Sequence, residues 1–258
     1  MSKNIYIGDI HGRTIWKDII AAHPDAATIT FIGDYFDSFD VSPVEQLHNI
    51  GQIVEFKKDK DFPGKTKVNL LIGNHDHHYW PGVGGSGTNG YQVVHSFQFE
   101  QFFNDNKAHF KMAALVGNVL CTHAGVSPIF LKDNGWVEPL TDDQDDDIVE
   151  FLNDLFTYKP RVFQFNGRDP FGDDIYQTPI WIRPRALQNA SKEKYPYNGS
   201  TYIKDRYIQV VGHTQQNTID IEGKATGGKY FYIDTLPVGQ YLIEEAGEFK
   251  IGYVNLDK

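Results

Sequence analysis

The chain has 258 residues, of which 40% are hydrophobic and 22% charged, and its formal net charge is −10. These values are typical of a soluble globular protein with a sizeable core, and the negative charge argues against broad binding to nucleic acid or to an anionic membrane surface. The single cysteine, Cys121, excludes an internal disulfide framework and fits a reducing compartment.

The start of the chain and its hydropathy bear on its location. The first apolar segment begins a few residues after Met1, which leaves no room for the apolar part of a signal peptide. No run of about 18 apolar residues follows, so we expect no membrane span. We therefore predict a cytoplasmic protein, and a monomer by default because nothing in the sequence indicates an oligomer.

The first half of the chain alternates short apolar segments with segments of helical periodicity. The apolar segments end at a glycine or a polar residue, as buried strands do, and they lie at 4–8, 27–35, 67–76 and 118–125. Apolar residues at helical spacing occupy 14–23 and 44–59. This alternation is typical of an α/β fold.

The second half has a different pattern. Four further strands are predicted at 206–214, 229–237, 239–247 and 248–256, and the Gly-containing turns between them favour antiparallel pairing. Residues 126–206 are richer in Pro, Asn and aromatic side chains, and we interpret this stretch as a cap-like insertion with two or three helices. We thus expect one domain over 1–258, of class α/β (α+β), with two sheets or one mixed sheet and helices outside.

Five predicted strands end at residues that could bind a metal ion or transfer a proton. In chain order these residues are Asp9 and His11, Asp34 and Asp37, Asn74 and His75, His123, and His213. Each alone could be an ordinary turn residue, but ligands of α/β sheets gather at strand ends, so the set predicts a shared site. Carboxylates, imidazoles and an amide without thiolates suit a pair of borderline divalent ions such as Mn²⁺, Fe²⁺ or Zn²⁺.

The motifs that hold these residues resemble those of a known family. In order, "GDIHG", "GDYFD", "GNHD", "THAG" and "GHT" between Gly8 and Thr214 resemble the calcineurin-like metallophosphoesterases. "GDIHG" and "GDYxD" resemble the serine/threonine protein phosphatase branch, and "HAG" in place of "HGG" is similar to its bacterial and phage members. The resemblance implies a two-sheet β-sandwich flanked by helices (αββα) and a metal-dependent phosphatase with two divalent ions, with Mn²⁺ expected and Fe or Zn as alternatives.

The resemblance also implies a role for each residue. Asp9 and His11 would bind the first metal ion, Asp34 would bridge both, and the second ion would be completed by Asn74, His123 and His213. A hydroxide that bridges the two ions would attack phosphorus. His75 would donate a proton to the leaving group, and Asp37 would orient His75.

The substrate is less well defined by the sequence. Where the protein phosphatase branch carries an arginine after "GDYxD", this chain has Ser38, so we expect Arg183 first and Arg185 second to bind phosphate. The leading prediction is a serine/threonine-type phosphomonoesterase acting on a phosphorylated protein, a peptide or a small phosphoester. The alternative is hydrolysis of nucleotides or dinucleoside polyphosphates. A non-catalytic binding scaffold is a further alternative, although such a protein should have lost ligands or the proton donor.

For several other residues in or near these strands, we predict a structural or local role. We expect Asp76 to bind local backbone and not metal, and His77 and His78 to be loop residues at the rim of the cleft. Asp234 could orient a histidine ligand or form a turn. Cys121 lies within an apolar strand and is predicted to be an inert core thiol.

Overall fold

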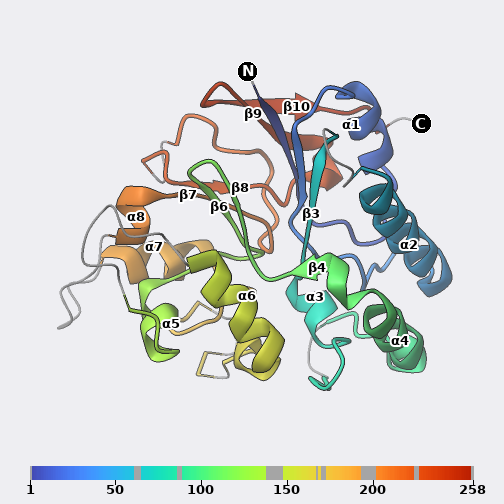
Figure 1. Cartoon of the computed structure of the whole chain (residues 1–258), viewed down its shortest axis with the longest axis horizontal. Coiled ribbons are helices and arrows are strands. Elements are labelled where there is room, and N and C mark those ends of the chain that lie inside the picture. Colours follow the sequence, from blue (N-terminus) through green and yellow to red (C-terminus); the bar gives the residue numbers. More distant parts are fainter. Residues whose placement is uncertain are drawn as a thin grey trace.

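The computed structural model describes residues 2–60, 65–85, 89–137, 148–166, 168–169, 173–192, 202–223 and 227–256. It contains two β-sheets with helices outside them, as predicted (Figure 1). The larger sheet has the strand order β10-β9-β1-β2-β3-β4, and the smaller has the order β5-β6-β7-β8.

The larger sheet combines the first strands of the chain with the last. Strands β1 (Lys3–Ile7), β2 (Thr28–Phe31), β3 (Lys67–Leu71) and β4 (Phe110–Lys111) run parallel, because helices cross over between them. Strands β9 (Gln240–Glu245) and β10 (Glu248–Tyr253) form an antiparallel hairpin, and β9 pairs antiparallel with β1. The chain therefore ends beside the strand with which it began.

The smaller sheet corrects one prediction. Strands β5 (Ala114–Val116) and β6 (Val119–Cys121) pair antiparallel, but β6, β7 (Ile208–Val211) and β8 (Tyr230–Tyr232) pair parallel. Antiparallel pairing of the late strands is thus right for β9 with β10 and wrong for β7 with β8. The connection over 212–229 is long enough for the crossover that parallel pairing requires, and β8 and β9 lie in different sheets.

The central strands are buried on both faces, and this explains their unbroken apolar runs. In β1, Ile5 and Ile7 belong to the cluster packed under the helices, whereas Tyr6 between them belongs to the cluster packed between the sheets. Cys121 and Phe231 of the smaller sheet belong to that same inner cluster. Both faces of the strand thus bury apolar side chains, as the period of two requires. Cys121 is buried with a free thiol, as predicted, and burial raises the pKa of that thiol.

The helices cover the outer faces of the sheets (Figure 1). Three of them, together with the short α3, come from the first half of the chain: α1 (Trp16–Ala22), α2 (Pro43–Lys60), α3 (Asn74–His77) and α4 (Ser96–Asn106). In the described part of the chain, 3₁₀ turns join other elements at Val93–His95 (η1), Lys107–His109 (η2), Pro160–Phe163 (η3) and Leu236–Val238 (η4). Among the described residues, none of the helices has the length and hydropathy of a membrane span.

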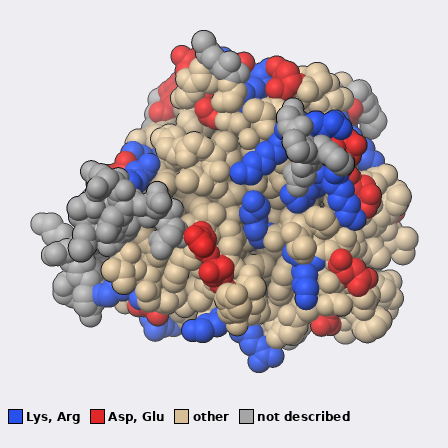
Figure 2. All heavy atoms as spheres, in the orientation of Figure 1, with Lys and Arg blue, Asp and Glu red and all other residues tan. Residues whose placement is uncertain are grey.

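The stretch 126–206 contains more helices than predicted. The described part holds α5 (Pro128–Asp133), α6 (Ile148–Tyr158), α7 (Pro184–Lys192) and α8 (Tyr202–Arg206). Its side chains Phe130, Leu152 and Ile180 join the same buried cluster as Ile5 of β1. Charged side chains of both signs are spread over the face of the molecule seen in Figure 2, with uncharged areas between them.

Candidate active site

The predicted ligands meet because they follow strands whose carboxyl ends lie together. Asp9 follows β1, Asp34 follows β2 and Asn74 begins α3 after β3, all on the parallel part of the larger sheet. His123 and His213 follow β6 and β7, which are parallel neighbours in the smaller sheet. The carboxyl ends of both sheets therefore deliver side chains to one edge of the sandwich.

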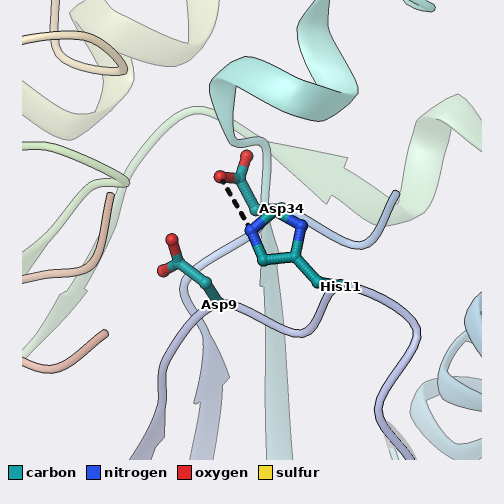
Figure 3. Close-up of side chains that lie close together, drawn as sticks. All are labelled: Asp9, His11 and Asp34. Atoms are coloured by element: carbon teal, nitrogen blue, oxygen red, sulfur yellow. Dashed lines mark ion pairs between the residues drawn. The ribbon is translucent and has the colours of Figure 1, made fainter. Parts of the chain in front are cut away.

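Three of these side chains form a compact group with the chemistry of a metal site. One potential ligand atom from each of Asp9, His11 and Asp34 lies within 4.8 Å of the others (Figure 3). The His11 ring donates from Nδ1 to the carbonyl of Phe36 at 2.7 Å, which leaves Nε2, 3.7 Å from Asp34 Oδ2, with its lone pair facing the carboxylates. The two carboxylates are almost completely buried.

The remaining three predicted ligands also lie close to one another, and one of them is near Asp34. Asn74 Oδ1 lies 3.0 Å from His123 Nε2 and 2.9 Å from His213 Nδ1. His123 Nε2 is also 3.3 Å from Asp34 Oδ2, and its Nδ1 donates to the carbonyl of Ile32 at 3.0 Å. The structure thus brings all six predicted metal ligands together, with the Asp34 carboxylate between the two groups.

The buried carboxylates and imidazoles of this site shift one another's pKa values. Burial and the neighbouring charge of Asp234 raise the pKa of Asp9 well above its ordinary value. Burial opposes the protonation of His123, but the charges of Asp34 and Asp9 outweigh it and raise the pKa of His123 to about 10. A cluster of buried carboxylates, imidazoles and an amide that need a positive charge fits divalent cations, so the residues present suit the metal ions that the motifs imply.

Several site residues adopt a backbone conformation that side chains usually avoid. The φ angles are 41° at His11, 52° at Asp34, 61° at Asp37 and 65° at His213. Among the described non-glycine residues, only Ala246 also has a positive φ. Such conformations cost free energy and persist where the surrounding structure holds them, and they gather at functional sites.

Glycines in the motifs make room for the carboxylates, a role that sequence analysis missed. A Cβ atom at Gly73 would lie 2.1 Å from Asp34 Oδ1, and one at Gly212 would lie 1.9 Å from Asp9 Oδ1. Backbone N–H groups one or two residues after these glycines also hold the carboxylates, since His75 N donates to Asp34 Oδ1 at 2.9 Å and His213 N donates to Asp9 Oδ2 at 3.0 Å. The signal was present in the sequence, because the ligand residue in "GNH" and in "GHT" directly follows a glycine.

The predicted proton donor stands beside the ligand group. His75 Nδ1 lies 2.9 Å from Asp37 Oδ2, and the His75 and His11 rings are 5.2 Å apart. Burial favours the neutral imidazole, but the charges of Asp34 and Asp37 outweigh it and raise the pKa of His75 above its ordinary value. The neighbouring carboxylates therefore favour the protonated, proton-donating form of His75.

The last residue of the "GNHD" motif and the two residues after it have partners elsewhere in the fold. Asp76 binds local backbone as predicted, because Oδ1 accepts from Tyr35 N at 2.8 Å and Oδ2 from Gly73 N at 3.0 Å. The prediction for His77 and His78 is wrong, since both are buried and not loop residues at a rim. His77 Nε2 donates to the carbonyl of Pro160 at 2.8 Å, and His78 Nε2 lies 2.8 Å from Asp37 Oδ2.

The two candidate phosphate-binding arginines differ in their surroundings. Arg183 is exposed just before α7, and its charge is near enough to contribute to the lowered pKa of His213, after the larger effects of burial and His123. Arg185 is 82% exposed, and its Nε lies 3.9 Å from Asp173 Oδ2. The Ser38 hydroxyl accepts from the backbone N–H groups of Asp40 and Val41 at 3.2 Å each, so it closes its own turn.

The chain is similar in sequence to one protein family and similar in fold to solved structures. The model of the family described as calcineurin-like phosphoesterases matches residues 5–216. No curated protein matches the chain significantly. A cold-active protein-tyrosine phosphatase from a psychrophilic Shewanella species has a similar solved structure, with 17% identity, a TM-score of 0.64, and coverage of 98% of this chain and 78% of that one. A metallophosphoesterase from Sphaerobacter thermophilus is less similar, with 14% identity, a TM-score of 0.43, and coverage of 98% and 88%.

Proposed function

The chain belongs to the calcineurin-like phosphoesterases and is a metal-dependent phosphatase, and on this premise we propose that it is a phosphomonoesterase of the serine/threonine type. The observation that supports this proposal is the pairing of His75 with Asp37 beside the ligand group. An alkoxide released from phosphoserine or phosphothreonine is a poor leaving group and needs a proton as the bond to phosphorus breaks. A held and protonated imidazole supplies one.

We propose the following roles for the ligand group. Asp9, His11 and Asp34 would hold one divalent ion, and Asp34 with Asn74, His123 and His213 would hold a second. When bound, such ions supply a nucleophile by lowering the pKa of water to about 7 and neutralise charge on the phosphoryl oxygens. Mn²⁺ is the ion we expect, with Fe or Zn as alternatives, because imidazole and carboxylate ligands suit all three.

The protein's own side chains carry the proton transfer. His75 donates its Nδ1 hydrogen bond to Asp37, which leaves Nε2–H as the transferable proton. As a water oxygen bonds to phosphorus, the bond to the leaving oxygen breaks, and that oxygen keeps the electron pair and takes the proton from His75 Nε2. Arg183 is our first candidate to bind a phosphate oxygen because its charge reaches His213, and Arg185 is the second.

A second candidate function is hydrolysis of nucleotides or dinucleoside polyphosphates. The leaving group is then a phosphate, which needs less protonation, so His75 would matter less. The Shewanella phosphatase is named for phosphotyrosine, but its likeness to this chain is one of fold, so a phosphotyrosine peptide serves as a comparison substrate.

The test loads the protein with Mn²⁺ and measures turnover of a phosphothreonine peptide, a phosphotyrosine peptide and a dinucleoside tetraphosphate, with His75→Asn alongside. We expect the phosphothreonine peptide to be preferred and the variant to lose about 10²- to 10⁴-fold on it. Preference for the dinucleotide with a small loss in the variant would support the second function. A protein that binds no metal and is not stabilised by it would instead be a binding scaffold.

A further inference from the structure

Asp37, which orients His75, has two further partners outside the five motifs that define the site. Its Oδ1 accepts a hydrogen bond from the Tyr79 hydroxyl at 2.6 Å, and its Oδ2 lies 2.8 Å from His78 Nε2 as well as 2.9 Å from His75 Nδ1. Asp37, His78 and Tyr79 are all buried. Both oxygens of the carboxylate are therefore engaged in a site from which water is largely excluded.

The direction of the Tyr79 hydrogen bond is determined by a third group. The backbone N–H of Gln92 donates to the Tyr79 hydroxyl at 2.7 Å, so one lone pair of that oxygen is already occupied. A hydroxyl has a single proton, and the carboxylate can only accept, so the Tyr79 proton points at Asp37. A continuous chain of donors thus runs from Gln92 N–H through Tyr79 to Asp37.

The ring that carries this hydroxyl has little freedom to move. It stacks on Tyr91 at 5.1 Å with 16° between the ring planes, and Phe99 packs against it edge-on at 4.9 Å. Phe36 also packs edge-on, at 5.7 Å. These contacts set the position of the Tyr79 oxygen, and through it the rotation of the Asp37 carboxylate.

We propose that Tyr79 is a positioning residue for the proton donor: it fixes the Asp37 carboxylate so that His75 keeps its Nδ1–H on Asp37 and its Nε2–H toward the leaving group. This inference rests on the proposed role of His75. Without the Tyr79 hydrogen bond, the carboxylate can rotate about its last side-chain bond, and the imidazole loses its fixed direction. The Tyr79–Asp37 hydrogen bond matters most for alkyl phosphoesters, whose leaving oxygen depends on the donated proton.

The test compares Tyr79→Phe with the matched variant Tyr91→Phe, which removes a hydroxyl from the same aromatic stack without touching Asp37. Two Mn²⁺-dependent reactions are measured: hydrolysis of a phosphothreonine peptide, and hydrolysis of 2,4-dinitrophenyl phosphate, whose leaving group is stable without a proton. We expect Tyr79→Phe to lose about tenfold on the peptide, the value of one charge-assisted hydrogen bond, and about twofold or less on the aryl ester. Tyr91→Phe should resemble the wild type on both.

A purely structural role gives a different result. Equal losses on the two substrates, or no loss on either, would overturn the proposal. His78→Gln, which keeps a donor near Asp37, should show the same dependence on the leaving group with a smaller loss. Each variant should still unfold cooperatively on heating, which shows that the activities compared are those of folded proteins.

A second readout does not depend on activity. The ¹⁵N chemical shifts of the His75 ring in the metal-free protein, recorded at a pH high enough for the ring to be neutral, report which nitrogen carries the proton. We expect a fixed Nδ1–H with its proton strongly hydrogen-bonded in the wild type, and a mixture of tautomers or a weakened signal in Tyr79→Phe. Identical ring spectra in the two proteins overturn the positioning role. If the spectra differ but His75→Asn shows no dependence on the leaving group, the proposed function has failed and the positioning of His75 stands.

Discussion

At the scale of single residues, the site depends on two glycines, which have no side chain, as well as on the side chains that meet there. Gly73 and Gly212 leave the space that the carboxylates of Asp34 and Asp9 occupy. Any side chain there would displace a proposed ligand from its position, although neither glycine could itself bind a metal ion. We therefore expect the two glycines to affect metal affinity through the position of these carboxylates.

We predict that Gly73→Ala weakens Mn²⁺ binding by about 10- to 100-fold, the usual effect of disturbing the groups that support a metal ligand. Its Cβ would lie 2.1 Å from Asp34 Oδ1, and the carboxylate must move away. Isothermal titration calorimetry on the metal-free protein measures the affinity. The control is Gly51→Ala within α2, where no atom lies within 4 Å of the added Cβ. Unchanged affinity in Gly73→Ala would show that Asp34 does not hold the ion.

The sequence predicted which side chains meet at this edge of the sandwich, and there is a physical reason for that. Parallel strands bring their carboxyl ends to one edge, so residues far apart in the chain can be assigned to one site from their place after each strand. The role of the glycines was not predicted, because it depends on which carboxylate from a neighbouring strand approaches each glycine. The burial of His77 and His78 was missed for a similar reason: their partners, Pro160 and Asp37, come from distant segments.

At the scale of elements, the stretch 126–206 is tied to the site through α3. The ring of His77 in α3 donates to the carbonyl of Pro160, the first residue of η3. A second link joins Arg161 Nε to the carbonyl of Gly82 at 2.9 Å. The sequence predicted helices in this stretch and strands elsewhere, because both follow from local periodicity. It did not predict the parallel pairing of β7 with β8, because turn composition near a strand does not reveal where a long connection leads.

Burial of the link between α3 and η3 makes stability depend on pH. Burial lowers the pKa of His77 to about 4 from its ordinary 6.5. Between about pH 4 and pH 6.5, the unfolded chain therefore binds a proton at His77 that the folded chain does not bind. The contribution of neutral, buried His77 to the free energy of unfolding is complete above pH 6.5 and is lost as the pH falls toward about 4.

We predict that the free energy of unfolding attributable to His77 is about 2 kcal/mol lower at pH 5 than at pH 7. His77→Gln can still donate to Pro160 but cannot take up a proton, so its stability should fall less over this interval. Urea unfolding of both proteins at the two pH values measures the difference. His48→Gln, at an exposed position of α2, should follow the wild type. Parallel pH profiles for wild type and His77→Gln would contradict the prediction.

At the scale of the whole molecule, the sandwich is closed by strands from opposite ends of the chain. β9 pairs with β1, and Leu242 of β9 lies opposite Tyr6 in the register. Both side chains belong to the inner cluster with Ile32, Leu71 and Val210. The strands that carry the ligands and the strands at the end of the chain therefore share one core.

We predict that Leu242→Ala lowers the free energy of unfolding by about 3 kcal/mol, the range for a fully buried leucine that leaves a cavity. Because the core is shared, loss of Mn²⁺ should coincide with loss of secondary structure on heating, in the variant as in the wild type. Circular dichroism and a metal-sensitive dye measure the two events. Leu256→Ala, at a side chain that is 51% exposed, serves as the control. Metal release at a clearly lower temperature than unfolding would indicate a separately melting site.

The pairing of β1 with β9 also has a consequence during translation. Lys3–Ile7 leaves the ribosome long before one of its two neighbours in the sheet, Gln240–Glu245. Until Gln240–Glu245 has been made, one edge of β1 is an unpaired, apolar strand edge, which can pair with another nascent chain. A protein with this topology should need chaperone protection while it is being made, and its yield should respond to the speed of translation between these two strands more than its finished stability suggests.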